Sequence, residues 1–103
     1  MNVKLLSIGD YMKKQDKLNW IINYITEHGW QDVFMEEFVN SYVKECKPNK
    51  IEDRYWGANR VPELGRYLSE LYKQGILKRF SATLNFQCDG FPKWCYGYYI
   101  KED

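Results

Sequence analysis

The chain has 103 residues, a length that suits a single domain. Its 4 Trp, 9 Tyr and 5 Phe residues exclude a disordered chain, and no run of about 18 apolar residues occurs that could cross a membrane. The formal net charge of +1 indicates no polyanionic partner by itself, and the apolar patch near the N-terminus is too short for a signal peptide, so we expect a cytoplasmic protein.

The N-terminal part of the chain is expected to hold an arm followed by a helix. Residues 1–14 carry scattered apolar side chains and are interpreted as a partly ordered arm. Asp16 can begin a helix, and Gly29 can end it. Between them, apolar side chains recur at helical spacing at Leu18, Ile21, Ile22 and Ile25. A first helix is therefore predicted over residues 16–28.

A second amphipathic segment follows Trp30. Asp32 can cap it, and Pro48 prevents the helix from extending past Lys47 because a residue before proline avoids the helical region. One face would carry Val33, Phe34, Phe38, Tyr42 and Val43. A second helix is therefore predicted over residues 32–46.

The third helix follows a polar connection over residues 47–58. Asn59 is expected to cap this helix, Pro62 is tolerated because it lies in the first turn, and Gly75 ends the pattern. The apolar stripe consists of Leu64, Leu68 and Leu71. A third helix is therefore predicted over residues 60–74.

The last third of the chain changes to the period of a strand. ILKRFSATLNFQ alternates apolar and polar residues, CDGFPKW has the residues of a turn, and WCYGYYI has the aromatic content of a returning strand. A β-hairpin is therefore predicted over residues 77–100.

Residues 63–80, ELGRYLSELYKQGILKRF, resemble the recognition helix and wing entry of winged helix-turn-helix DNA-binding domains. In that family, spaced leucines are followed by a glycine, two aliphatic residues and a basic strand. These positions correspond to Leu64, Leu68, Leu71, Gly75, Ile76, Leu77, Lys78 and Arg79. Gly65 and Arg66 match the polar or small residue and the arginine that follow the first apolar position in the family. The resemblance implies an α+β fold over residues 15–103, a three-helix winged helix-turn-helix with a C-terminal β-hairpin wing. The connection over residues 47–58 is longer than the turn usual in the family.

Charge is distributed unevenly in a way that suits this resemblance. Residues 54–80 carry six basic and two acidic residues, whereas residues 1–53 contain no arginine and have a net charge of −2. Arginine suits forked contacts with phosphates and guanine edges. The resemblance implies sequence-specific binding of double-stranded DNA by a transcriptional regulator that occludes its operator, with a homodimer matching a palindromic site.

The resemblance also implies which side chains contact DNA. The N-terminal half of the third helix would enter the major groove. Its base contacts would be Asn59, Arg60, Glu63, Arg66 and Tyr67, with Glu63 accepting from cytosine and Arg66 forking to guanine. Phosphate contacts would be Arg54, Lys73, Lys78, Arg79 and Lys93.

Two alternatives stay open. Glu63 with Arg66, and Arg66 with Glu70, have the spacing of surface helix pairs that would leave a solvated face without a ligand. The chain is also similar to small free-standing winged-helix proteins of phages and mobile elements. The rival function is therefore a phage-type protein-interaction module that binds and redirects a host or CRISPR-type protein complex. DNA binding predicts a steep salt dependence, and a protein partner predicts much less.

The aromatic residues are expected mainly in the core and the sheet, with base stacking or a partner surface as alternatives. This expectation covers Trp20, Trp30, Trp94, Tyr96, Tyr98 and Tyr99.

Neither a catalytic nor a metal-binding motif is found. The cysteines at 46, 88 and 95 lack CxxC spacing, and the single histidine, His28, is expected to contact the last carbonyls of its helix. We therefore expect no enzyme, no metal site and no cofactor.

Overall fold

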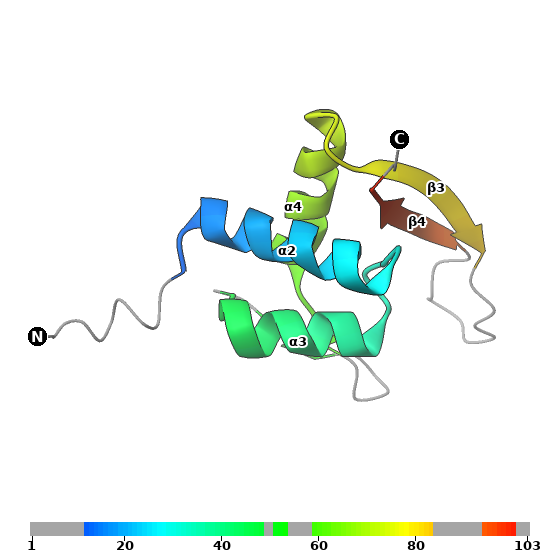
Figure 1. The fold of residues 1–103 in the computed structure, drawn as a ribbon. Coiled ribbons are helices and arrows are strands. Elements are labelled where there is room, and N and C mark those ends of the chain that lie inside the picture. The colour runs from blue at the N-terminus through cyan, green and yellow to red at the C-terminus, as the bar shows by residue number, and fades with distance from the viewer. Residues whose placement is uncertain (1–11, 49–50, 54–58, 84–93, 101–103) are drawn as a thin grey trace, which may run out of the picture.

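The computed structural model describes residues 12–48, 51–53, 59–83 and 94–100 and places three helices beside a two-stranded hairpin (Figure 1). In chain order the elements are α2 (Lys14–His28), α3 (Glu36–Cys46), β1 (Glu52–Asp53), β2 (Asn59–Arg60), α4 (Pro62–Lys73), β3 (Lys78–Thr83) and β4 (Trp94–Tyr99). The chain is thus a small α+β protein, as predicted. Among the described residues, every helix is too short or too polar to cross a bilayer.

Helix α2 begins two residues earlier than predicted and ends where predicted. Lys13 is its N-cap, and Asp16 lies in its first turn, where a carboxylate favours the helix dipole. Gly29 adopts a positive φ of 86° and donates its N–H to the carbonyl of Ile25 at 2.9 Å, which ends the helix. Most of the predicted arm, residues 1–11, lies outside the described residues.

Helix α3 begins four residues later than predicted because Asp32 closes a turn instead of capping the helix. Its Oδ1 accepts the N–H of Phe34 at 2.8 Å, and its carbonyl accepts the N–H of Met35 at 3.2 Å. Met35 is the N-cap that the helix adopts. At the other end, Lys47 takes a left-handed conformation before Pro48, and the predicted end of the helix is confirmed.

Helix α4 begins at Pro62, and Asn59 does not cap it. Asn59 and Arg60 instead form β2, which pairs antiparallel with β1, and β1 lies inside residues 47–58, the stretch predicted as a polar connection. Val61 is the N-cap, without a side-chain hydrogen bond. The fixed φ of proline suits the first helical position, so the helix starts there without a polar cap.

The predicted hairpin is confirmed as the antiparallel pair β3 and β4, with Lys78 opposite Tyr99 and Thr83 opposite Trp94. Its predicted turn falls in residues 84–93, outside the described residues. The other edge of β4 has a partner too. Tyr98 and Gln31 exchange two backbone hydrogen bonds of 2.9 and 3.0 Å, which fixes the hairpin to the loop after α2.

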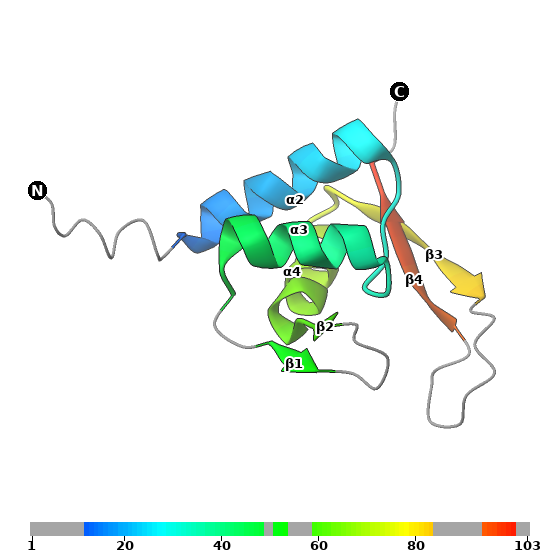
Figure 2. The same ribbon diagram turned by 90° about the horizontal axis from the view of Figure 1, so that it is seen from below.

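The core lies where the three helices meet. Helices α2 and α3 run side by side, α4 crosses them, and the hairpin lies at the C-terminal end of α2 (Figures 1 and 2). The predicted leucine stripe of α4 points into this core. Fully buried side chains are Ile21, Phe38, Tyr42, Cys46, Leu64, Leu68, Leu71 and Leu77.

Candidate nucleic-acid interface

Helix α4 turns a cationic face to solvent. Pro62, Arg66, Ser69 and Lys73 recur at intervals of three or four residues opposite the buried leucines, and Arg66 and Lys73 are exposed. The predicted outward position of Arg66 is therefore confirmed. This face is where a ligand would meet the helix.

Both acidic side chains of α4 are held by lysines of α2. Glu70 pairs with Lys14 at 2.9 Å, and Glu63 pairs with Lys17 at 2.8 Å. The expected pairs between these acids and Arg66 are not formed among the described residues. The two carboxylates are thus turned toward α2, and the outward face of α4 keeps its positive charge.

Glu63 is buried at the junction of the three helices, so the expectation that it reads a base edge was wrong. It is 5% exposed, and its Oε2 accepts hydrogen bonds from Lys17 Nζ at 2.8 Å and from the Tyr42 hydroxyl at 2.5 Å. Lys17 is also only 5% exposed. Burial and the hydrogen bond to Glu63 raise the pKa of Tyr42, so its hydroxyl stays a donor. We call Lys17, Tyr42 and Glu63 the buried triad.

Tyr67 does not share the outward face either. Its ring packs against the core, and Lys14 Nζ of α2 lies 5.8 Å from the ring centroid. Residue 67 lies one turn after Glu63 on the side of α4 that faces α2, which explains why both residues are withdrawn from solvent. The predicted base contact at Tyr67 is therefore not supported.

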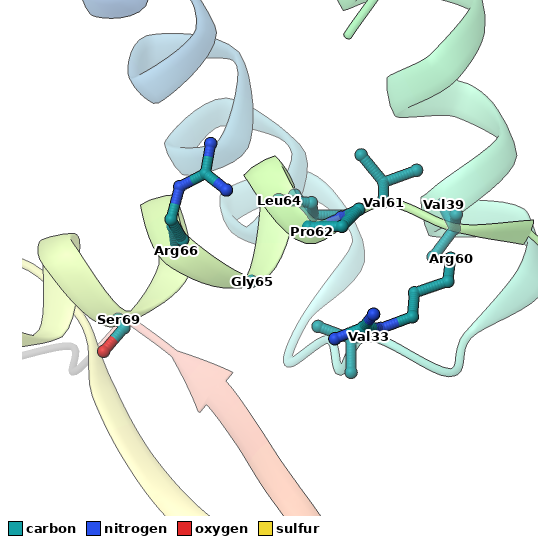
Figure 3. A pocket seen from close by; sticks show the side chains of 9 residues that line it. All are labelled: Val33, Val39, Arg60, Val61, Pro62, Leu64, Gly65, Arg66 and Ser69. Carbon is teal, nitrogen blue, oxygen red and sulfur yellow. The ribbon is translucent and has the colours of Figure 1, made fainter. Parts of the chain in front are cut away.

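The arginines of α4 and β2 flank a groove of about 410 Å³ (Figure 3). Arg60 belongs to β2, not to the helix as predicted, and its side chain is exposed. In Figure 3, Arg60 and Arg66 lie on either side of Gly65. The remaining lining is mostly apolar and consists of Val33, Val39, Val61, Pro62, Leu64 and Ser69.

Arg79 of β3 is held between two aromatic rings. Its guanidinium carbon lies 3.9 Å from the ring centroid of Tyr72, on α4, and 3.9 Å from that of Tyr96, on β4. Arg79 also lies opposite Tyr98 in the register of the hairpin. Stacking on two faces fixes the plane of the guanidinium and leaves its edges as the groups that can donate to a ligand.

Of the other residues predicted to contact phosphates, two lie within the described structure and two lie outside it. Lys73 and Lys78 are exposed, on the last turn of α4 and the first position of β3. Arg54 and Lys93 lie outside the described residues. The described cations therefore extend from the outward face of α4 onto the start of the hairpin.

The hairpin also carries a partly exposed aromatic cluster. Trp30, Phe80 and Tyr99 are 42%, 38% and 37% exposed, and the ring of Phe80 lies 5.0 Å from that of Trp30 and 6.1 Å from that of Tyr99. Trp94 is 51% exposed. The expectation of a core or sheet position is confirmed for Trp20, Tyr96 and Tyr98. Trp94 and Tyr99 also lie in the sheet, on β4, but they are partly exposed there. Trp30 lies outside both the core and the hairpin strands.

Two buried cysteines near the core have raised pKa values. Burial raises the pKa of the Cys46 thiol to about 12, and burial with the neighbouring Asp32 raises that of Cys95 to about 11. His28 Nδ1 lies 3.1 Å from the carbonyl oxygen of Tyr24, as expected. Among the described residues, no group of three or more His, Cys, Asp or Glu side chains lies close enough together to hold a metal ion. Cys88 lies outside the described residues.

The buried triad was missed although the sequence holds a signal for it. Lys17 precedes Ile21 by four residues and therefore occupies a position of the apolar stripe of α2. Glu63 directly precedes Leu64 and borders the leucine stripe of α4 on its flank. Opposite charges at two such positions indicate a buried pair, since a charge is rarely buried without a partner.

Comparison with known proteins adds no relative, because the chain matches no protein-family model, no curated protein and no solved structure.

Proposed function

We propose that the protein binds double-stranded DNA through the outward face of α4 and the hairpin, on a winged-helix scaffold. The observation that carries this proposal is the capture of both α4 carboxylates by lysines of α2. Phosphate oxygens repel carboxylates, so a helix meets DNA more favourably when its acids are turned inward. Glu63 is buried, and Glu70, which neighbours Arg66 and Lys73 and is 34% exposed, is paired with Lys14. Arg66 and Lys73 then face the ligand without an unpaired acid beside them.

The layout of the elements supports the same proposal. Helix α4 follows two packed helices and leads directly into a hairpin, and Gln31 adds a third backbone partner beside β4. In this arrangement α4 is the recognition helix and enters the major groove. Arg66, in its first half, forks to a guanine edge. Lys73, Lys78 and Arg79 bind phosphates and set the orientation without reading sequence.

A regulatory role follows from this mode of binding. A protein of this size covers a short stretch of duplex, and it represses by occluding an operator. A palindromic operator is met by a homodimer, since twofold DNA symmetry requires a twofold protein. On this proposal the protein is a cytoplasmic binding protein and not an enzyme.

The salt dependence of duplex binding tests the proposal. We expect the affinity for a labelled duplex, measured by fluorescence anisotropy, to fall steeply between about 50 and 200 mM salt. Arg66→Glu is expected to lower the affinity at least about tenfold, because it removes a cation and adds an acid facing the phosphates. Lys44→Glu, an equal change at an exposed position of α3, is the control and should stay within about twofold. Affinity that is flat with salt, or unchanged in Arg66→Glu, contradicts the proposal.

A protein-interaction module is the second candidate, and the aromatic cluster of Trp30, Phe80 and Tyr99 favours it. Contacting aromatic rings that stay exposed are typical of protein interfaces. This function predicts that binding of a protein partner is lost in Trp30→Ala and changes little with salt. DNA binding through α4 predicts the reverse for both measurements.

A further inference from the structure

Gly65 lies inside α4, where glycine is unfavourable. A helix-interior glycine costs about 0.5–1 kcal/mol relative to alanine, because it loses more backbone freedom on folding. In some proteins close packing between helices explains such a glycine. Here, among the residues that the structure describes, a Cβ built on Gly65 would meet only Val33 Cγ1, at 3.9 Å, which is an ordinary contact. The packing of the described residues therefore gives no reason for the glycine.

The groove gives a reason. Gly65 lies between Arg60 and Arg66 in Figure 3 and lines the same depression of about 410 Å³. A missing side chain at this position lets a ligand approach the helix backbone. The exposed Arg60 of β2 lies at the rim and favours an anionic ligand, and Arg66 of α4 lines the same groove.

The chemistry of the residues that line the groove further limits the class of ligand that it can bind. Apart from the arginines and Ser69, the groove is walled by aliphatic side chains and Pro62. Aliphatic walls pack well against C–H groups, and they offer few hydrogen-bond partners to the donors and acceptors of a base edge. A deoxyribose with its phosphate has both properties, an apolar ring face and an anionic group.

We infer that the groove around Gly65 holds one sugar–phosphate unit of a DNA strand, with its phosphate bound by Arg60. This inference rests on the proposed DNA binding and adds to it a defined contact with the backbone. It moves Arg60 from the base-reading residues to the residues that position the duplex. Such a contact contributes equally to binding of every DNA sequence.

Gly65→Ala separates this role from folding. The substitution fits the fold and improves helix propensity, so the thermal midpoint should rise or stay unchanged. The added methyl group projects from the groove floor and should lower the affinity for a labelled random-sequence duplex about tenfold, which is the loss of one charge-assisted contact. Asn40→Ala, at an exposed position of α3, is the control for helix propensity and should leave the affinity unchanged.

Arg60→Gln tests whether Arg60 binds a DNA phosphate in the groove. We expect about a fivefold weaker complex at low salt and a plot of log affinity against log salt that is less steep by about 0.9, the value for one phosphate. Lys44→Gln removes an equal charge away from the groove and should change neither quantity. Inorganic phosphate alone is added to DNA-free protein as a second arm. The inference would be overturned if phosphate raised the thermal midpoint, Arg60→Gln abolished that rise, and Gly65→Ala left duplex binding unchanged. The groove would then be a site for a free anion.

The outcomes distinguish the two proposals. If the wild-type protein binds the duplex and both groove variants bind as tightly as their controls, the groove inference is wrong and DNA binding stands. If the wild-type protein does not bind the duplex in a salt-dependent way, DNA binding itself is refuted and the groove inference with it.

Discussion

Neutralising Glu63 should destabilise the protein strongly, although the residue lies beside the proposed DNA-binding face. Glu63→Gln keeps the size of the side chain and an acceptor for the Tyr42 hydroxyl, but it leaves the Lys17 ammonium without a counter-charge. Lys17 is 5% exposed and cannot be hydrated where it lies. Removing one partner of a buried ion pair costs about 3–5 kcal/mol. We expect about 3 kcal/mol, the lower end of that range, because one hydrogen bond of the triad is kept.

The double variant makes this expectation specific. Lys17→Met combined with Glu63→Gln removes both charges and keeps the hydrogen bond to Tyr42. Replacing a buried ion pair by neutral groups is often close to neutral for stability, so the double variant should regain most of the loss. Lys17→Met alone, which leaves the Glu63 carboxylate without its cation, completes the cycle, and the coupling energy should then reach at least about 3 kcal/mol.

Urea unfolding followed by tryptophan fluorescence measures these free energies. The ring of Trp20 lies 5.5 Å from that of Tyr42, so its emission reports on this part of the core. Each variant should keep the dependence of unfolding free energy on urea concentration, since the same surface is exposed on unfolding. A loss below about 1 kcal/mol in Glu63→Gln, or additive losses in the double variant, would refute the role given to the pair.

Three further predictions concern other parts of the structure. Gly97→Ala should cost about 1–3 kcal/mol in thermal or urea unfolding, because its Cβ would lie 2.6 Å from Cζ of Phe80; unchanged stability would show that the ring moves aside freely. Cys46 is protonated in the folded state up to a pKa of about 12, while the unfolded thiol ionises near 9.0, so stability is full below pH 9.0 and declines above it. The slope should be about 1.4 kcal/mol per pH unit, and a Cys46→Ala variant that keeps the same slope would contradict this cause. Arg79→Lys keeps the charge but loses the stack on two tyrosine rings, so duplex affinity should fall severalfold, whereas Lys78→Arg should not weaken binding; equal affinities for both variants would argue against the stack.

The helices were predictable where a periodic apolar stripe and a glycine or proline marked them. The stripe Leu64, Leu68 and Leu71 identified α4 and its buried side, because the repeat of 3.6 residues fixes which side chains share a face. Gly29 marked the end of α2 for a local reason, its positive φ. The start of α3 was misplaced because Asp32 has two uses, as a cap or in a turn, and the residues nearby do not distinguish them.

The candidate site was predictable only in part. Arg66 was placed correctly because its angular distance from the leucine stripe follows from helix geometry alone. Glu63 and Tyr67 lie on the flank of the same helix, where the packing partner decides between solvent and core. For Glu63 that partner is Lys17, 46 residues away in sequence.

Composition and periodicity by themselves determined that this chain forms three helices and a hairpin, and which side of α4 is apolar, because both follow from interactions between near neighbours. Only the tertiary structure decided that α2 binds the acids of α4, that Arg60 leaves the helix for β2, and that Gly65 opens a groove instead of packing against a helix. Those outcomes depend on contacts between segments distant along the chain, and the free energy of such contacts exists only once the segments are packed together.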